Sequence, residues 1–372
     1  MHILTSAQRI IIKVGSSLIA HKEQGKARHY WMAGLAQDIA ALRRDGKEVV
    51  IVTSGAVALG RGILGFDAKP LTLVDKQAAA ACGQFLLMHE WQNVFAEDGI
   101  KVAQLLLTLD DSESRKRYLN ARTTLNALLA HGVIPIVNEN DTVATAELRV
   151  GDNDRLAARV AQMISADVLI LLSDIDGLYT ADPSKNPEAR FIADVPHITE
   201  QICNYAAPPS SRVGTGGMIT KIEAAMMATS SGCHMILAQG AIHRPINALH
   251  AGGKHTLFHA QTSPLKARKE WIAGVFSPSG MLVIDEGACA ALQRGTSLLP
   301  VGVVEVRGTF QRGDVVMVVR SFTGNVIAKG LVCYPDHEMR AIVGMQSAQI
   351  VEALGYERGD VAIHRDDLVM MI

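Results

Sequence analysis

Short apolar runs alternate along the chain, up to about residue 260, with longer stretches whose apolar residues recur at helical spacing. Residues 10–14 form a β-branched run of strand length, and residues 30–44 have helical spacing before the helix-ending pair Asp45-Gly46. Further strands are predicted at 49–52, 100–107, 133–137, 168–172, 233–237 and 256–258, and further helices at 76–96, 121–130 and 156–164. This alternation predicts an α/β fold with a mainly parallel sheet sandwiched by helices.

The pattern changes after residue 260. Residues 260–270 (AQTSPLKARKE) are polar and contain a proline, and we interpret 260–275 as a linker. Short strands bounded by glycine are predicted beyond it at 282–284, 302–306, 314–319, 326–330 and 361–364, with helices at 286–294 and 347–354. The sequence therefore predicts two domains, an α/β domain at 1–259 and a small β-rich, barrel-like domain at 276–372.

Two polar tetrads interrupt the larger predicted domain. Asn138-Glu-Asn-Asp141 follows the strand at 133–137, and Gly151-Asp-Asn-Asp154 precedes a helix predicted to begin near Leu156. A buried amide or hydroxyl without a partner costs roughly 1 to 3 kcal/mol, so these tetrads must face something polar. A small, multiply hydrogen-bonded ligand at the carboxyl end of a strand is favoured, and helix capping with turn formation is the alternative.

Small and polar residues also follow other predicted strands. They form the turns Gly15-Ser16-Ser17, Thr53-Ser54-Gly55 and Ser173-Asp174. Since ligands of parallel sheets bind beyond the carboxyl ends of the strands, binding residues are expected to gather in these turns.

The stretch 214–221 (GTGGMITK) is the clearest phosphate signal, and it opens a helix that runs to about residue 231. Its glycines allow close approach of the backbone, and a helix N-terminus attracts anions. The string is not a Walker A loop, and the chain has no G-x-G-x-x-G that opens a first βαβ unit. A glycine-rich helix start without function is the alternative.

Lys13 lies where the first predicted strand ends, and Lys221 lies one turn into the helix after the glycines. A lysine at a strand end either reaches solvent or points to a ligand. Two lysines on either side of a phosphoryl group, with Mg²⁺ on the nucleotide, supply the charge neutralisation that phosphoryl transfer needs.

The group that accepts the phosphoryl group can also be inferred from its chemistry. A carboxylate with a pKa of about 4.3 is ionised in all but about one molecule in 500 at pH 7, so it needs positioning and charge screening but no general base. Amide and hydroxyl donors, together with acidic residues that suit an ammonium group, make an amino-acid substrate compatible with this set of residues. Composition does not name which amino acid.

Composition narrows the class of protein. The 372-residue chain is 48% hydrophobic with a formal net charge of −1, which gives no electrostatic basis for nucleic acid or membrane as the main partner. Its five cysteines form no CxxC pair, and its 13 histidines form no HExxH motif. The scattered cysteines indicate a reducing compartment. No apolar run approaches the 18 residues of a membrane-spanning helix, and a cytoplasmic location is expected.

Six strings along the chain resemble the glutamate 5-kinases, a branch of the amino acid kinase family. They are IIIKVGSS, VIVTSGAVALG, VIPIVNENDTVA, VGDND, SDIDGLYTADP and GTGGMITK. The joint presence of NEND, VGDND and GTGGMITK is specific, whereas a fragment such as IIIKVG is shared by many kinases of this fold. The C-terminal segment resembles the PUA domain that follows the kinase domain in many bacterial members. The resemblance, which runs from about residue 8 to the end, implies phosphorylation of the L-glutamate side-chain carboxylate by ATP to L-glutamyl 5-phosphate, in proline biosynthesis.

The resemblance also implies roles for individual residues. Lys13 matches a lysine that contacts the ATP phosphates, Lys221 one that stabilises the transferring group, and Asp154 an aspartate that holds both lysines. The implied substrate-binding residues are Ser54, Gly55, Asn138, Asp141, Asp152 and Asn153. The implied ATP-binding residues are Lys13, Gly15, Ser173, Asp174, Thr215, Gly216, Gly217, Met218, Ile219, Thr220 and Lys221.

The implied cofactors are ATP and Mg²⁺, with no metal ligand assigned to the protein. Further implied properties are a homo-oligomer (dimer or tetramer), feedback inhibition by proline, and transfer of the labile product to glutamyl-phosphate reductase.

Two other interpretations remain open at this point. One is another kinase of the same fold that acts on N-acetylglutamate, aspartate or carbamate, although the acid-rich tetrads suit a free ammonium group better than an acetylated nitrogen. The other is an RNA-associated protein, because PUA domains accompany such enzymes. Residues 275–372 hold eight Lys and Arg against eleven Asp and Glu, a net charge of −3, whereas an RNA-binding face is usually basic.

Overall fold

The computed structural model describes residues 2–21, 25–66, 70–143, 152–206, 217–356 and 359–371, with only the backbone of Asp152. The chain divides into two compact units, Met1–Pro264 and Leu265–Ile372. Each unit has its own hydrophobic core.

The first unit is built on a sheet of eight described strands in the order β3-β4-β2-β1-β5-β9-β10-β8. They are β1 (Arg9–Val14), β2 (Glu48–Val52), β3 (Val102–Leu107), β4 (Ile134–Glu139), β5 (Val168–Ser173), β8 (Asp194–Val195), β9 (His234–Gln239) and β10 (His255–Phe258). Neighbouring strands are parallel except β9 and β10. The mainly parallel sheet is therefore confirmed, while the antiparallel β10 was not predicted. A separate two-stranded ribbon pairs β6 (Leu178–Tyr179) with β7 (Phe191–Ile192).

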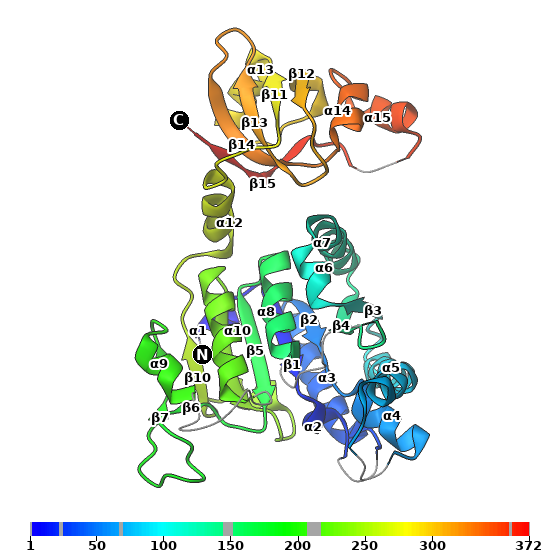
Figure 1. The fold of residues 1–372 in the computed structure, drawn as a ribbon, viewed down its shortest axis with the longest axis vertical. Coiled ribbons are helices and arrows are strands. Elements are labelled where there is room, and N and C mark those ends of the chain that lie inside the picture. The colour runs from blue at the N-terminus through cyan, green and yellow to red at the C-terminus, as the bar shows by residue number, and fades with distance from the viewer. Residues whose placement is uncertain are drawn as a thin grey trace. The chain divides into compact units, whose positions relative to one another are not determined.

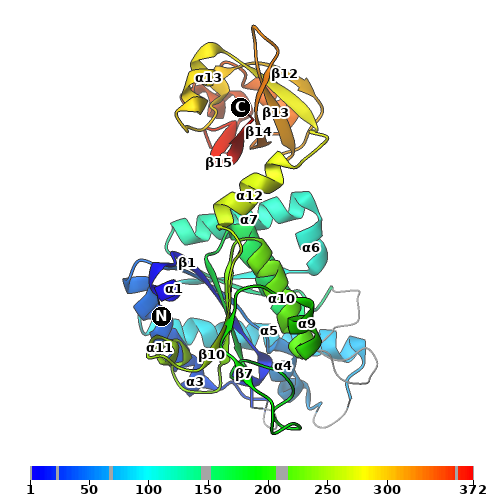
Figure 2. The same ribbon diagram turned by 90° about the vertical axis from the view of Figure 1, so that its left-hand side faces the viewer.

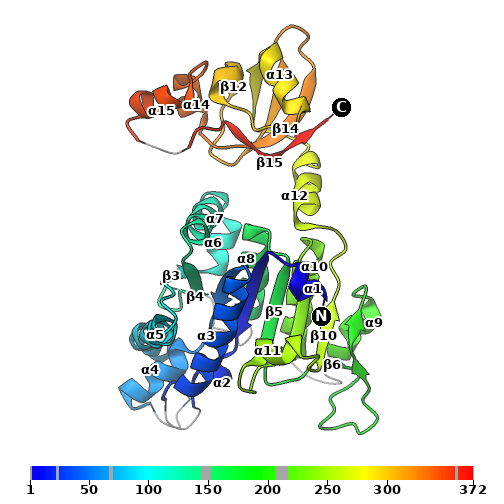
Figure 3. The same cartoon turned by 180° about the vertical axis from the view of Figure 1, so that it is seen from behind.

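Helices cover both faces of this sheet. One core contains side chains of α3 (His29–Arg44), α5 (Leu73–Ala96) and α11 (Pro245–His250), and the other contains side chains of α7 (Arg115–Ala130), α8 (Asp152–Ile164) and α10 (Met218–Ser230). Figure 1 shows α8 and α10 in front of the sheet, Figure 3 shows α3 and α11 on the opposite face, and Figure 2 views the layers from the side. The shorter helices are α1 (His2–Ser6), α2 (Ser16–Ile19), α4 (Ala56–Leu64), α6 (Leu109–Glu113) and α9 (Glu200–Ala206).

Alternation along β1 decides where its lysine points. Ile10, Ile12 and Val14 belong to the core under α3, whereas Ile11 belongs to the core under α8. Because successive strand side chains point to opposite faces, Lys13 shares the face of Ile11. The sheet thus directs Lys13 toward α8.

Two helices begin earlier than their apolar spacing predicts. The helix expected near Leu156 begins at Asp152, so Asn153 lies in its first turn rather than in a preceding loop. Acidic residues are stabilised in a first helical turn by the helix dipole, although they add nothing to the apolar period. Helix α5 begins at Leu73 rather than near residue 76, because Thr72 and Asp75 form a capping box.

The second unit is built on a five-stranded sheet in the order β12-β11-β13-β14-β15, in which only β11 and β13 are parallel. Its strands are β11 (Gly280–Ile284), β12 (Val303–Gly308), β13 (Val315–Arg320), β14 (Val326–Val332) and β15 (Ile363–Met370). Its helices are α13 (Glu286–Gln293), α14 (Asp336–Ala341) and α15 (Ser347–Leu354), with a 3-10 turn at Pro300–Gly302. The β-rich second domain is confirmed, and β15 extends well beyond the strand predicted at 361–364.

The stretch predicted as a linker contains helix α12 (Pro264–Ala273). Lys329 Nζ donates to the carbonyl oxygens of Ala273 at 3.1 Å and Val275 at 2.8 Å, which satisfies acceptors at the end of this helix. The helix is thus tied to β14 of the second unit, whose fully buried side chains include Phe310 and Tyr334.

Candidate active site

The predicted site residues that the structure describes gather at one edge of the larger sheet. Strands β4, β2, β1 and β5 are parallel neighbours, so their carboxyl ends meet at the same edge. The chain adds β2, β3 and β4 on one side of β1 and then returns to add β5 on the other side. Ligands of open α/β sheets bind where the direction of strand addition reverses in this way.

Asp154 lies between the two predicted lysines. Its Oδ1 is 2.5 Å from Lys13 Nζ, and its Oδ2 is 3.2 Å from Lys221 Nζ. Asp154 is 1% exposed and Lys13 is 7% exposed, so this group of charges is shielded from solvent. The three residues come from α8, β1 and α10, and one carboxylate thereby fixes the positions of both ammonium groups.

The charge of Asp154 is maintained against burial. Burial raises the pKa of the Asp154 carboxyl, but the positive charges of Lys13 and Lys221 and their hydrogen bonds outweigh it, so its pKa lies below the ordinary value. Asp154 is therefore ionised at neutral pH, and the group carries two positive charges against one negative charge. The excess positive charge suits a site for phosphate or carboxylate groups.

The first turn of α10 is also tied to Asp154. Thr220 Oγ1 donates either to Asp154 Oδ2 at 3.1 Å or to the Gly217 carbonyl at 3.0 Å. Gly217 caps the helix at its N-terminus. The first two helical residues, Met218 and Ile219, are partly exposed, Ile219 at 43%. The exposed helix N-terminus beside Lys221 has the chemistry that binds anions.

A relay of hydrogen-bonded side chains runs along the same edge. Asn153 Nδ2 donates to Ser54 Oγ at 2.8 Å and, more weakly, to Asn138 Oδ1 at 3.5 Å. Asn138 Nδ2 donates to Gln84 Oε1 at 2.7 Å. The relay crosses from α8 on one face of the sheet to α5 on the other, over the ends of β2 and β4.

Two atoms of this relay are buried without a hydrogen-bond partner among the described residues. They are Asn153 Oδ1, an acceptor, and Gln84 Nε2, a donor. Unpaired buried polar atoms are rare in native proteins, and at the edge of a binding site a ligand can supply the partner. An unpaired donor and an unpaired acceptor within one relay match the carboxylate and ammonium groups of an amino acid.

Gly55 shapes the turn after β2. Its φ of 110° and ψ of −6° lie in a region that other residues rarely adopt, and a Cβ there would lie 2.9 Å from Ile19 Cγ2. The turn directs Ser54 to the relay and leads at once into α4.

The remaining predicted residues have the following positions. Gly15 precedes α2 at the end of β1, and Ser173 Oγ donates to Asp174 Oδ1 at 2.9 Å after β5. Asp141 lies half-buried in the turn after β4. Thr215, Gly216 and the side chain of Asp152 lie outside the described residues.

Sequence patterns did not single out Gln84. It lies within helix α5, away from the turns that follow strands, and one glutamine in a helix rich in alanine is no signal by itself. Gln239, whose Nε2 donates to the Asp174 carbonyl at 3.1 Å, was likewise not predicted.

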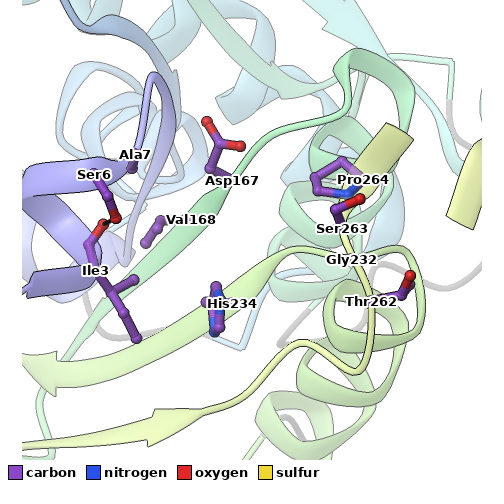
Figure 4. Close-up of a pocket in the computed structure, with 10 residues that line it drawn as sticks. All are labelled: Ile3, Ser6, Ala7, Asp167, Val168, Gly232, His234, Thr262, Ser263 and Pro264. Atoms are coloured by element: carbon purple, nitrogen blue, oxygen red, sulfur yellow. Dashed lines mark hydrogen bonds between the residues drawn. The ribbon is translucent and has the colours of Figure 1, made fainter. Parts of the chain in front are cut away.

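A cavity of about 260 Å³ lies elsewhere in the first unit. Asp167 and Val168 at the start of β5 and His234 at the start of β9 line it, between α1 and residues 262–264 (Figure 4). These are the amino ends of the strands, so this cavity is distinct from the predicted site.

Comparison with known proteins agrees with this fold. Residues 8–239 match the amino acid kinase family, and residues 280–354 match the PUA domain. The chain belongs to the amino acid kinase family.

Its relatives match along the whole chain. It is 54% identical over 367 residues to the glutamate 5-kinase of Paramagnetospirillum magneticum, covering 99% of both chains. It is 52% identical to the glutamate 5-kinase of Rhodospirillum rubrum, over 97% of this chain and 96% of that protein. The glutamate 5-kinase of Caulobacter vibrioides is also 52% identical, over 98% and 97%.

Membership of a kinase family implies ATP as the phosphoryl donor. Among the described residues, no group of three or more His, Cys, Asp and Glu side chains is arranged to hold a metal ion. Of the helices in the described part of the chain, none has the length and apolar character needed to cross a membrane.

Proposed function

We propose that the chain transfers the γ-phosphoryl group of ATP to the side-chain carboxylate of L-glutamate, giving ADP and L-glutamyl 5-phosphate. The observation that carries this proposal is the Lys13–Asp154–Lys221 group beside the amide relay. The first suits transferring phosphate, the second suits an amino acid, and the full-length similarity to glutamate 5-kinases supports the pairing.

The two lysines neutralise the negative charge of the phosphate groups. Lys13 neutralises the ATP phosphates, and Lys221, at the start of α10, neutralises the phosphoryl group as it moves between oxygens. Asp154 holds both ammonium groups in place through its two oxygens. No general base is required, because the attacking carboxylate is already ionised at neutral pH.

Residues of the nucleotide side are assigned by their position. Gly15, Ser173 and Asp174 lie at the ends of β1 and β5, and we assign them to ATP together with the stretch 215–221. Mg²⁺ would arrive on the ATP phosphates, which commonly supply much of its coordination, and would add charge neutralisation there.

We assign the relay of hydrogen-bonded side chains to the amino-acid substrate. Ser54, Asn138 and Asn153 offer hydroxyl and amide groups, and the backbone N–H of Gly55 lies in the same turn. We assign Asp141 and Asp152 to the same site, where a carboxylate would pair with the substrate ammonium. This pairing distinguishes L-glutamate from N-acetylglutamate, whose nitrogen carries no charge.

For the second unit we propose a role in assembly or regulation. Its net charge of −3 over residues 275–372 argues against an RNA-binding face. Filter binding that detects tight RNA affinity, weakening steeply with salt, would overturn this assignment.

We propose a cytoplasmic homo-oligomer that is inhibited by proline and that passes its labile acyl phosphate to glutamyl-phosphate reductase. Size-exclusion chromatography with light scattering tests the oligomer, and addition of proline to the kinase assay tests the inhibition.

Release of ADP in the presence of single acceptors tests the proposed reaction. L-Glutamate, L-aspartate and N-acetylglutamate would be compared at equal concentrations with saturating Mg-ATP. ADP release that depends on L-glutamate alone is expected, and release with N-acetylglutamate but not L-glutamate would assign the chain to another kinase activity of this fold.

A further inference from the structure

Gln84 is a buried donor at the edge where the substrate is proposed to bind. Asn138 Nδ2 occupies its Oε1 at 2.7 Å, which fixes which way the Gln84 amide faces. Its Nε2 is buried and has no hydrogen-bond partner within the part of the chain that the structure describes. Leaving such a donor unpaired is costly, so a ligand acceptor is its natural partner.

The position of Gln84 is set by unusually close helix packing. A Cβ on Gly83 would lie 1.8 Å from the Ala56 carbonyl oxygen, and one on Gly60 would lie 1.8 Å from that of Ala79. Helices α4 and α5 therefore touch backbone to backbone. Since α4 begins directly after Ser54 and Gly55, this contact holds Gln84 in fixed register with the turn after β2.

The place of Gln84 in the relay indicates which part of the substrate it meets. Asn153 is adjacent in sequence to Asp154, which holds the lysines, and the relay leads from Asn153 through Asn138 to Gln84. Counted in hydrogen bonds along the relay, Gln84 is thus the member most removed from the two lysines and Asp154. A carboxylate accepts hydrogen bonds and an ammonium group only donates them, so an amide N–H at this end selects a carboxylate.

We propose that Gln84 is a specificity-determining residue that donates from Nε2 to the α-carboxylate of the substrate. This inference rests on the proposed function. With the α-carboxylate held at Gln84 and the reacting carboxylate at the lysines, the span between the two ends selects the length of the amino-acid side chain.

The test exchanges the donor for an acceptor. Gln84→Glu has nearly the same shape but presents a carboxylate, so it repels the α-carboxylate of L-glutamate and accepts from an α-carboxamide. Steady-state kinetics would compare L-glutamate with L-isoglutamine, which differs only by the α-carboxamide. Gln92→Glu is the matched control, because Gln92 is exposed on the same helix.

The expected result is a reversal of preference. In Gln84→Glu the KM for L-glutamate rises about 10- to 100-fold, the scale of a hydrogen bond to a charged group, with kcat and the KM for ATP nearly unchanged. The KM for L-isoglutamine falls below that of the unsubstituted protein. Gln92→Glu changes neither.

Equal loss on both substrates, or a fall in kcat with the KM for L-glutamate unchanged, would overturn the proposal and leave Gln84 a structural residue. If thermal unfolding shows that Gln84→Glu does not fold, Gln84→Leu replaces it, with a raised KM for L-glutamate alone as the expected result. If the unsubstituted protein phosphorylates a different amino acid, the proposed function fails, and that acid and its α-carboxamide decide the role of Gln84.

Discussion

Lys13 Nζ lies 2.5 Å from Oδ1 of Asp154, and both side chains are almost fully removed from solvent. A lysine on the central strand and an aspartate in the first turn of α8 meet because the strand points Lys13 to the face that α8 covers. Since buried charges persist only when paired, each of the two residues depends on the other.

Replacing Asp154 by Asn should impair both turnover and stability. The change leaves the buried Lys13 and the partly buried Lys221 without their counter-charge, and breaking a buried pair typically costs about 3 to 5 kcal/mol. Urea unfolding measures the free energy, and the kinase assay measures turnover. Asp182→Asn is the control, because its pair with Lys185 is exposed and contributes little to stability. Equal effects of the two substitutions would argue against a special role for Asp154.

Lys13→Ala and Lys221→Ala should each lower turnover by two or more orders of magnitude. Loss of one preorganised donor to a transition state costs roughly 3 to 4 kcal/mol. Circular dichroism checks that the fold remains, and Lys185→Ala, at an exposed lysine, should behave like the unsubstituted protein. Near-normal turnover in either variant would remove that lysine from the mechanism.

The close packing of α4 on α5 should not tolerate a methyl group. Gly83→Ala places a Cβ within 1.8 Å of the Ala56 carbonyl, so the helices must separate, at a cost of about 1 to 3 kcal/mol or more. Gly274→Ala is the control, because its added Cβ would lie at an ordinary contact distance of 3.4 Å from the Glu270 carbonyl oxygen. Urea unfolding compares the two. An unchanged midpoint for Gly83→Ala would contradict the packing argument.

Stability should depend on pH through His234, which lines the cavity of Figure 4. Burial lowers the pKa of His234, the neighbouring His259 lowers it further, and Asp167 raises it in part, so the pKa lies below its ordinary value. The unfolded chain then binds the proton more readily, and stability is lost as pH falls from about 6.5 toward the folded pKa.

Urea unfolding between pH 7.5 and 5 checks this dependence. His234→Gln should flatten the fall in unfolding free energy below about pH 6.5, whereas the same change at the exposed His131 should leave it unaltered. A profile for His234→Gln that is as steep as that of the unsubstituted protein would contradict the assignment of this pH dependence to His234.

The strands, and the edge of the sheet where the site residues lie, were predictable because buried parallel strands are continuous β-branched runs followed by small polar turns. Residues 10–14 and 168–172 were expected as strands, and the structure has them as β1 and β5. The start of α8 was missed, because Asn153 and Asp154 are polar and the apolar period begins only at Leu156.

Contacts between distant elements explain what the sequence did not predict. Gln84 is brought to the site by its contact with Asn138 and by the close approach of α5 to α4 at Gly83, and neither contact has a local sequence pattern. The antiparallel β10 is another case, since a short strand does not encode its own direction. Pairing of Lys13 with Asp154 was expected only from family resemblance.

Trapping of the product with hydroxylamine tests the central claim most directly. Hydroxylamine converts an acyl phosphate into a hydroxamate, and mass spectrometry with authentic standards distinguishes the γ- from the α-hydroxamate of glutamate. L-Glutamate, N-acetylglutamate and L-aspartate would be incubated side by side with Mg-ATP and the protein. The account predicts γ-glutamyl hydroxamate from L-glutamate alone, whereas no product from L-glutamate together with product from another acid would contradict the proposed amino-acid site.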